Sequence, residues 1–472
     1  MTLSRSGDGQ SGSARAHFVL VPMMAQGHTI PMTDMARLLA EHGAQVRFIT
    51  TPVNAARLEG FAADVKAAGL AGQLVELHFP SVEFGLPDGC ENLDMIQSKN
   101  LFLNFMKACA ALHEPLMAYL REQQHSPPSC IISDMAHWWT GDIARELGIP
   151  RLTFSGFCGF SSLVRYIIFH NNVLEHVTDD NELITIPGFP TPLELTKAKL
   201  PGGTLCVPGM EQIREKMFEE ELRCDGEITN SFKELETLYI ESYEQITRKK
   251  VWTIGPMCLC HRNSNRTAAR GNKASMDEAQ CLQWLDSRKP GSVIFVSFGS
   301  LACTTPQQLV ELGLGLEASK KPFVWVIKAG AKLPEVEEWL ADGFEERVRD
   351  RGVPMITWPH FAEQFLNEKL VVDVLKLGVE VGVQGVTHWV TEQQEVMVTR
   401  DAVETAVNTL MGEGEATEEL RMRAKDCAIK ARRAFDEEGS SYNNFIRSVC
   451  MKQNENKEPR SYLFASGSHC VD

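Results

Sequence analysis

The chain has 472 residues, of which 43% are hydrophobic and 23% charged, and its formal net charge is −15. This length exceeds one ordinary core and predicts two large α/β domains or three small ones. The acidic balance disfavours a nucleic-acid partner, because phosphate-backbone binding needs concentrated Lys and Arg. The sequence holds no apolar run long enough to span a bilayer, and its 13 scattered cysteines suit the reducing cytoplasm. We therefore expect no membrane span and a cytoplasmic location.

Strand and helix patterns alternate along the first half of the chain. Residues 1–16 are polar, lack the apolar segment of a signal peptide, and predict a disordered arm. Strands are predicted at His17–Pro22, Gln45–Thr50, Cys130–Ser133, Pro150–Phe154 and Glu227–Asn230, and helices at Met32–His42, Thr140–Leu147 and Leu235–Lys249. This order is typical of a parallel sheet with crossover helices. Residues 17–257 are therefore assigned to an N-terminal domain.

The alternation restarts after a polar segment without periodicity, residues 258–275, which is the predicted linker. Residues 276–452 are assigned to a second α/β domain, and residues 453–472 to a disordered tail. Thr305, Pro306 and Gln308 fit the N-cap, first position and third position of a helix that begins with a capping box. The other expected elements are strands at Ser292–Phe298, Phe323–Ile327 and Val353–Thr357, helices at Glu363–Leu375, Ala416–Phe435 and Ser441–Lys452, and an apolar helical stripe at Val336, Leu340, Phe344 and Val348.

Two polar residues of the first domain follow predicted strands and are candidates for catalysis. His28 lies between the first strand and the first helix, where a neutral imidazole is able to take a proton from an alcohol. Asp134 directly follows the strand Cys130–Ser133 and would orient such a histidine. The simpler alternatives are that His28 caps backbone groups at a helix start and that Asp134 is the N-cap of the next helix. The spacing alone does not show that the two side chains meet.

The second domain offers hydroxyl, carboxylate and amide groups at comparable positions. Ser300 ends a Ser-Phe-Gly-Ser turn whose amides and hydroxyls suit phosphate oxygens. Glu363 and Gln364 suit the hydroxyls of a sugar, although they also fit an ordinary helix start. A G-x-G-x-x-G fingerprint and a Walker motif are both absent from the sequence, which disfavours a dinucleotide oxidoreductase or P-loop enzyme. Cys258, Cys260 and His261 lack a second ligand pair, so no metal site is predicted.

Several segments together resemble the plant UDP-dependent glycosyltransferases of secondary metabolism. They read PMMAQGHTIPM, IISDM, FVSFGS, GVPMITWPHFAEQFLNEKL and EGSSYNNF, and the resemblance covers residues 17–452. It implies the GT-B arrangement of two facing Rossmann-like domains, with His28 as general base and Asp134 as its partner. It also implies diphosphate contact by Ser300 and sugar contact by Glu363 and Gln364, with Gln364 typical of glucose users. The implied co-substrate is a UDP-sugar, with no metal or other cofactor.

The implied acceptor is a small molecule such as a flavonoid, terpenoid or hormone. Trp138, Phe157 and Phe160 are candidate liners of its pocket, because acceptor pockets of this fold are built from loops of the first domain. The implied reaction transfers a hexose, expected to be glucose, to a hydroxyl group with inversion. The sequence does not identify the acceptor.

The first half of the family's donor-binding signature has no counterpart before Gly352. The charged segment 344–350 runs through Arg351 straight into Gly352, so the second domain is expected to lack two strand–helix units, roughly forty residues. Two interpretations stay open: a working glucosyltransferase, or an impaired family member such as a splice form, a pseudoenzyme or a truncated gene model. If the strand at 353–357 moved over to pair with the strand at 292–298, strain or exposed apolar surface would follow.

Overall fold

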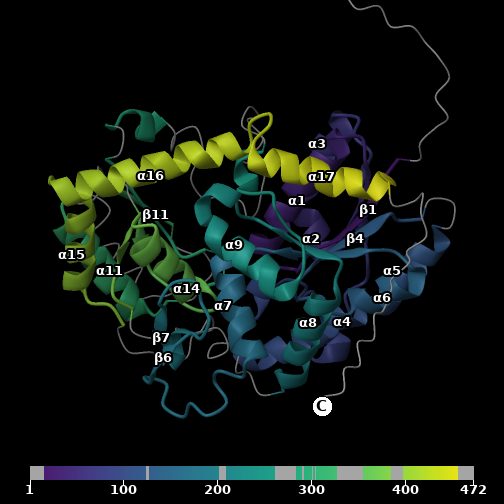
Figure 1. Cartoon of the computed structure of the whole chain (residues 1–472), viewed down its shortest axis with the longest axis horizontal. Coiled ribbons are helices and arrows are strands. Elements are labelled where there is room, and N and C mark those ends of the chain that lie inside the picture. The colour runs from purple at the N-terminus through teal and green to yellow at the C-terminus, as the bar shows by residue number, and fades with distance from the viewer. Residues whose placement is uncertain are drawn as a thin grey trace, which may run out of the picture.

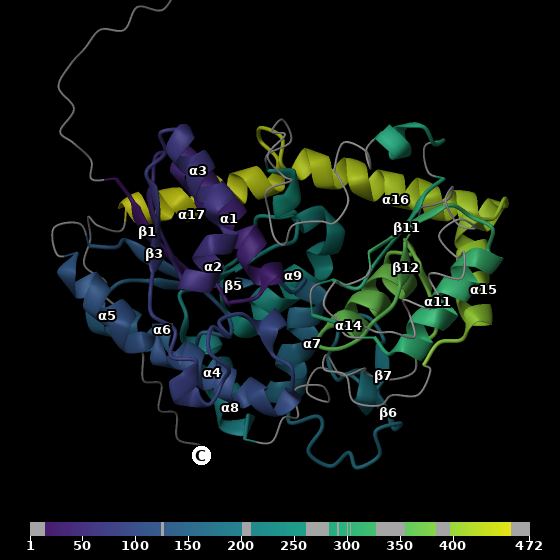
Figure 2. The same ribbon diagram turned by 180° about the vertical axis from the view of Figure 1, so that it is seen from behind.

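The computed structural model describes residues 15–123, 127–200, 209–260, 283–289, 292–299, 301–302, 304–326, 355–383 and 397–454. Ser300, the predicted stripe at 336–348, the junction at Gly352, most of the predicted linker and almost all of the arm and tail lie outside these residues. Two α/β assemblies lie side by side, with the N-terminal half of the chain in one and most of the C-terminal half in the other (Figures 1 and 2).

The N-terminal half is built on a seven-stranded sheet in which every neighbouring pair of strands is parallel. Its strands are β1 His17–Val21, β2 Gln45–Thr50, β3 Gly72–Glu76, β4 Cys130–Asp134, β5 Arg151–Ser155, β8 Gly226–Thr229 and β9 Val251–Thr253. The order across the sheet is β3-β2-β1-β4-β5-β8-β9, so the direction of winding reverses between β1 and β4. Open sheets of this kind bind ligands at that switch point, beyond the carboxyl ends of the strands.

Helices cover both faces of this sheet (Figure 1). They are α1 Gln26–Glu41, α2 Pro52–Arg57, α3 Glu59–Ala67, α4 Phe102–Ala111, α5 His113–Glu122, α6 Thr140–Leu147, α7 Gly159–His170, α8 Glu211–Arg223 and α9 Lys233–Thr247. In β1 the side chains alternate between two hydrophobic cores: Val19 and Val21 belong to one, Phe18 and Leu20 to the other. A strand buried on both faces needs the continuous apolar run seen here.

The C-terminal half contains two short parallel ladders. Strand β10 Ile294–Ser297 pairs with β11 Phe323–Val326, and β12 Ile356–Thr357 pairs with β13 Val379–Glu380. Among the described residues no ladder joins β10 to β12, so the pairing considered for the strand at 353–357 is not formed there. The accompanying helices are α11 Pro306–Ala318, α14 Gln364–Lys369 with a π-helical continuation Leu370–Val374, and α15 Arg400–Met411. A hairpin of β6 Leu183–Thr185 and β7 Glu194–Thr196 lies outside the large sheet.

The last two helices cross back over the molecule to the first sheet (Figure 1). α16 Glu415–Ala434 leads to α17 Ser440–Asn454. The Ser441 hydroxyl donates to the carbonyl of Gly255 at 2.6 Å, and Phe445 is buried in the same core as Phe18. The sequence assigned α17 to the second domain, whereas its packing ties it to the first.

The start of α11 confirms half of the predicted capping box. Thr305 Oγ1 accepts a hydrogen bond from the amide of Gln308 at 3.3 Å, as an N-cap should. The other half of the predicted box, a hydrogen bond from the Gln308 side chain back to the N-cap, is wrong. The Gln308 side chain is buried and points to the segment before α15. There it donates to the carbonyl of Val398 at 2.7 Å and accepts from the amides of Met397 and Val398. Tertiary packing thus redirects a residue that local sequence would use as a cap.

Candidate active site

The switch point of the first sheet brings His28 and Asp134 together. β1 and β4 run in parallel with Val21 beside Ser133, so the residues that follow the two strands emerge at the same edge. His28 lies in the first turn of α1, and Asp134 is the last residue of β4. His28 Nδ1 and Asp134 Oδ2 are 2.7 Å apart. The Asp134 carboxylate is fully buried, whereas the His28 side chain keeps 34% of its surface exposed.

The simpler roles considered for these two residues do not describe their contacts. The N-cap of α1 is Ala25, and the His28 ring is bound to a carboxylate. Asp134 Oδ1 accepts from the amide of Ala136 at 2.9 Å, but α6 begins only at Thr140. Asp134 therefore closes a local turn with one oxygen and holds the histidine with the other.

The charges of the pair stabilise one another. Burial alone would lower the pKa of His28, but the Asp134 carboxylate outweighs this effect and the pKa is raised above its usual value. Burial would raise the pKa of Asp134, yet the interaction with His28 leaves it below its usual value. Because an ionised carboxylate only accepts hydrogen bonds, Nδ1 of His28 carries the proton and Nε2 is left with the lone pair of a base.

A second histidine, His137, lies behind the pair and was missed by the sequence analysis. It is fully buried, and its Nε2–H donates to the carbonyl of Pro22 at 2.9 Å. Burial lowers its pKa, so the ring is neutral beside Asp134. The sequence could have pointed to His137 by its position, three residues after Asp134 at the end of β4.

Glu363, at the start of α14, faces the first domain. Burial raises the pKa of its carboxyl group, and the charge of His28 acts in the opposite direction. The Asn367 side chain donates to Glu363 Oε1 at 3.3 Å and accepts from the Ser161 hydroxyl of α7 at 3.2 Å. This bridge connects Glu363 and α14 to α7 of the first domain.

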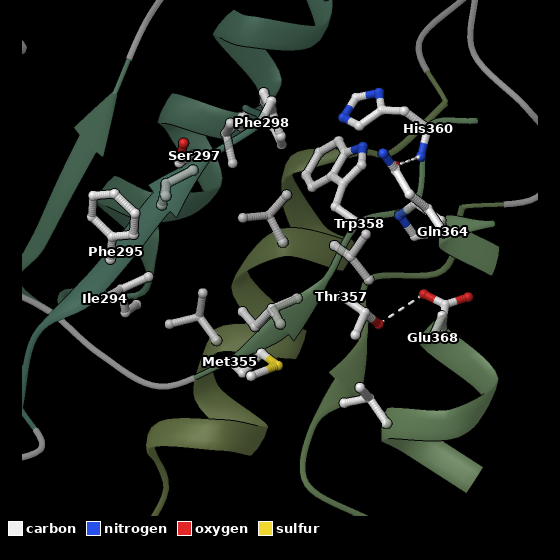
Figure 3. Close-up of a pocket in the computed structure, with 18 of the residues that line it drawn as sticks. Ile294, Phe295, Ser297, Phe298, Met355, Thr357, Trp358, His360, Gln364 and Glu368 are labelled. Carbon is white, nitrogen blue, oxygen red and sulfur yellow. Dashed lines mark hydrogen bonds between the residues drawn. The ribbon is translucent and has the colours of Figure 1, made fainter. Parts of the chain in front are cut away.

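Gln364 is fixed by the loop that precedes it (Figure 3). Its Oε1 accepts from the backbone amide of His360 at 2.7 Å, which leaves the side-chain amide hydrogens available for another acceptor. The His360 ring packs against Phe298 at 4.9 Å and Trp358 at 6.5 Å between ring centres, and burial lowers its pKa to about 4. His360 is therefore neutral near pH 7 and serves as part of an aromatic cluster.

The other predicted site residues have different environments. Trp138 is half-buried against the core below β1 and β4, and the half-buried ring of Phe157 lies 5.9 Å from the Arg165 guanidinium. Phe160 is fully buried and packs edge-to-face on Phe189 and Tyr239, so its ring belongs to the core. Within the described ranges no three His, Cys, Asp or Glu residues cluster as metal ligands, and no helix there is long and apolar enough to cross a membrane.

Known proteins resemble this chain over nearly its whole length, although no protein-family model matches it. UDP-glycosyltransferase 73C10 of Barbarea vulgaris is 41% identical over 91% of this chain and 94% of its own, and UDP-glycosyltransferase 73C5 of Arabidopsis thaliana is 40% identical over 92% and 95%. The alignment with 73C10 has 469 positions, whereas 91% of 472 residues is about 430. About 40 positions are therefore filled in that relative and empty in this chain.

Solved structures agree with these relatives. The structure of Glycyrrhiza uralensis UGT73P12 with glycyrrhetinic acid 3-O-monoglucuronide superposes with a TM-score of 0.83 and 31% identity, over 94% of this chain and 98% of that one. Arabidopsis thaliana UGT89C1 with UDP-L-rhamnose has the same fold at 21% identity and a TM-score of 0.68, over 93% of this chain and 99% of its own. The chain has the GT-B fold, and it belongs to the plant UDP-glycosyltransferases, enzymes that transfer a sugar from a UDP-sugar.

Proposed function

We propose that this protein transfers glucose from UDP-glucose to a hydroxyl group of a small lipophilic acceptor, with inversion at the anomeric carbon and His28 as general base. The observation that carries the proposal is the 2.7 Å contact between His28 Nδ1 and the buried Asp134 carboxylate. It orients a partly exposed imidazole with Nε2 free to receive a proton. We further propose a cytoplasmic location.

The reaction follows from this arrangement. Nε2 of His28 takes the proton of the acceptor hydroxyl, and Asp134 stabilises the imidazolium that forms. The acceptor oxygen then forms a bond to the anomeric carbon from the face opposite the leaving group. The bond from that carbon to the UDP oxygen breaks, UDP leaves with the electron pair, and the configuration inverts. His28 afterwards releases its proton to water.

The donor sugar is assigned to the start of α14. Glu363 accepts hydrogen bonds from two adjacent hydroxyls, and Gln364 donates from the amide hydrogens that its bond to His360 leaves available. Ser300 is assigned to the diphosphate. Trp138 and Phe157, both half-buried, are assigned to the acceptor pocket. UGT73P12 binds a glycyrrhetinic acid derivative, which favours a large, rigid, lipophilic acceptor here as well.

The test is an assay of UDP release and glucoside formation with UDP-glucose and a panel of flavonoid, terpenoid and hormone acceptors. Removal of a general base costs about 10²- to 10⁴-fold in rate, so His28→Ala should lower turnover by that factor. His42→Ala is the matched control, because the His42 ring packs edge-to-face on Phe445 of α17 and its Nδ1 bonds to the carbonyl of Leu38 in its own helix. Turnover that survives His28→Ala unchanged contradicts the assignment.

A second candidate is a family member impaired on the donor side. The specific observation in its favour is the set of about 40 positions that the Barbarea relative fills and this chain does not. Loss of several charge-assisted phosphate contacts would cost several kcal/mol of donor binding, since each contributes about 1.5–3 kcal/mol. Calorimetric titration with UDP-glucose separates the two candidates: binding in the micromolar to low millimolar range supports the transferase, and no binding supports the impaired form.

A further inference from the structure

A cavity of about 370 Å³ lies between β10 and β12 in the second half of the chain. Figure 3 shows apolar side chains of the two strands turned toward this space from opposite sides, with α14 and α15 beside it. Ile294 and Val296 line it from β10, Ile356 and Thr357 from β12, and Met355 from just before β12. Met355 is 55% exposed and Phe295, also at the rim, 64% exposed. The cavity is thus a gap in a sheet rather than a hole in the core.

The strands on either side have the geometry of one interrupted parallel sheet. Both ladders are parallel, β10 with β11 and β12 with β13. Ile294 of β10 and Val381, just after β13, belong to one hydrophobic cluster with residues of α11 and α15, so shared helices hold the two ladders in place. Strands in a sheet lie about 4.8 Å apart, and one open position leaves room for a single extended chain.

Polypeptide suits this space better than a small molecule does. Within the described part of the chain, one edge of β10 is paired with β11 and one edge of β12 with β13, and the two remaining edges face the cavity. Strand edges carry N–H and C=O groups that hydrogen-bond to an added strand. A small apolar ligand would fill the space but leave these groups without partners, at a cost in free energy.

The comparison with the relatives indicates which polypeptide fits this space. In total, about 40 positions are filled in the Barbarea relative and empty here, and the first half of the family's donor-binding signature has no counterpart before Gly352. We propose that the space between β10 and β12 is an open strand position that binds an extended apolar polypeptide in trans as a parallel strand, and that the segment it fits is the one this chain lacks before Gly352. This proposal does not depend on catalysis.

The experiment uses the full chain and a synthetic peptide with the roughly 40 residues that precede the counterpart of Gly352 in UDP-glycosyltransferase 73C10. At ten times its Kd the peptide should raise the thermal midpoint by about 3 °C. It should also slow amide hydrogen exchange at least tenfold at 294–297 and 356–357. Hydrogen exchange distinguishes strand addition from unspecific adhesion, because only the former protects these two edges. Neither measurement requires transferase activity.

Two exposed strand residues make a matched pair of variants. Phe295→Asp places a charge at the rim of the cavity, and Val326→Asp places one on β11 away from the cavity. Because the wild-type Phe295 and Val326 side chains are 64% and 49% exposed, both variants should fold. Phe295→Asp should weaken peptide binding at least tenfold, and Val326→Asp less than twofold. Circular dichroism checks the fold of each.

Four outcomes overturn the proposal. They are no effect of the peptide, an equal effect of a scrambled peptide, equal binding by Phe295→Asp and wild type, and full protection of 294–297 and 356–357 in the free protein. The last would mean that the chain's own residues, or a second copy if protection depends on protein concentration, already occupy the position.

Discussion

The Nδ1 atom of His28 lies 2.7 Å from Oδ2 of Asp134, although 106 residues separate the two in the chain. They meet because β1 and β4 are parallel neighbours at the point where the winding of the sheet reverses. Asp134 is fully buried. An ionised carboxylate without a partner would be costly there, so His28 is part of the electrostatic balance of the fold as well as of the site.

Replacement of Asp134 by Asn tests whether the Asp134 charge raises the pKa of His28. Asn keeps the shape and the acceptor for Ala136 but removes the charge that raises the pKa of His28, so the pKa of His28 should fall below its usual value under the remaining effect of burial. A general base acts in its neutral form, and the acid limb of the pH–rate profile should therefore move to lower pH. Turnover should fall by about 10²- to 10⁴-fold, because the imidazolium loses its partner. NMR titration of the His28 ring gives the pKa directly, and an unchanged value would falsify the coupling.

Removal of the Asn367 side chain tests the bridge between α14 and α7. Asn367→Ala deletes the hydrogen bond to Glu363, worth about 1 kcal/mol, and should raise the KM or Kd for UDP-glucose about fivefold. Ser161→Ala removes one contact of Asn367 with the start of α7. A second contact, from the Cys158 thiol at 3.5 Å, and the bond to Glu363 stay intact, so this variant serves as the comparison. If both variants bind UDP-glucose as wild type does, the orientation of Glu363 is not limiting for the donor.

A buried acidic pair in the first domain predicts a pH-dependent stability. The Tyr243 hydroxyl lies 3.1 Å from Glu227 and 3.2 Å from Glu221, and Glu221 is also paired with Arg165. Burial, and then the nearby Glu221 charge, raise the pKa of Glu227 from 4.5 to about 7. Between these values the folded state binds a proton that the unfolded state has lost, so this group's contribution to stability decreases as the pH rises from 4.5 to 7.

Glu227→Gln removes that dependence. The unfolding free energy of the variant relative to wild type should increase by about 1 kcal/mol per pH unit between pH 5 and 7 and level off above pH 7. Urea unfolding at pH 5, 6, 7 and 8 measures it. Glu219→Gln is the control, because Glu219 is a glutamate of the same domain whose side chain is 58% exposed. A constant difference for Glu227→Gln across this range would show that Glu227 is ionised throughout.

The return of α17 to the first sheet predicts a large effect of one distant side chain. Phe445 is 2% exposed and packs against His42 with ring centres 5.2 Å apart. Phe445→Ala should destabilise the protein by about 3–5 kcal/mol. Met422→Ala on α16 should have almost no effect, because its side chain is 62% exposed. Urea unfolding measures both, and a small effect of Phe445→Ala would place α17 outside the cooperative core.

The sequence predicted several regular elements with accurate bounds but missed others, among them the apolar helices α4 and α7. Strand β2 and helix α6 have the predicted bounds, and β4 extends its prediction by one residue. The strands β3 Gly72–Glu76, β6, β7, β9 Val251–Thr253 and β13 Val379–Glu380 were missed. They lie at the edges of their sheets, where pairing with a neighbouring strand, more than a local apolar pattern, makes them strands.

The sequence by itself determined the family, the parallel α/β class and the identity of the polar residues that follow the strands, because these depend on local patterns and on long matching segments. Only the tertiary structure decided which of them meet: strand order placed Asp134 beside His28, and the bridge from Ser161 to Asn367 placed α14 against α7. It also decided that β10 and β12 stay apart, since the helices that they share hold both ladders in position. Contacts between distant segments depend on how whole elements pack, and no single segment of the chain encodes them.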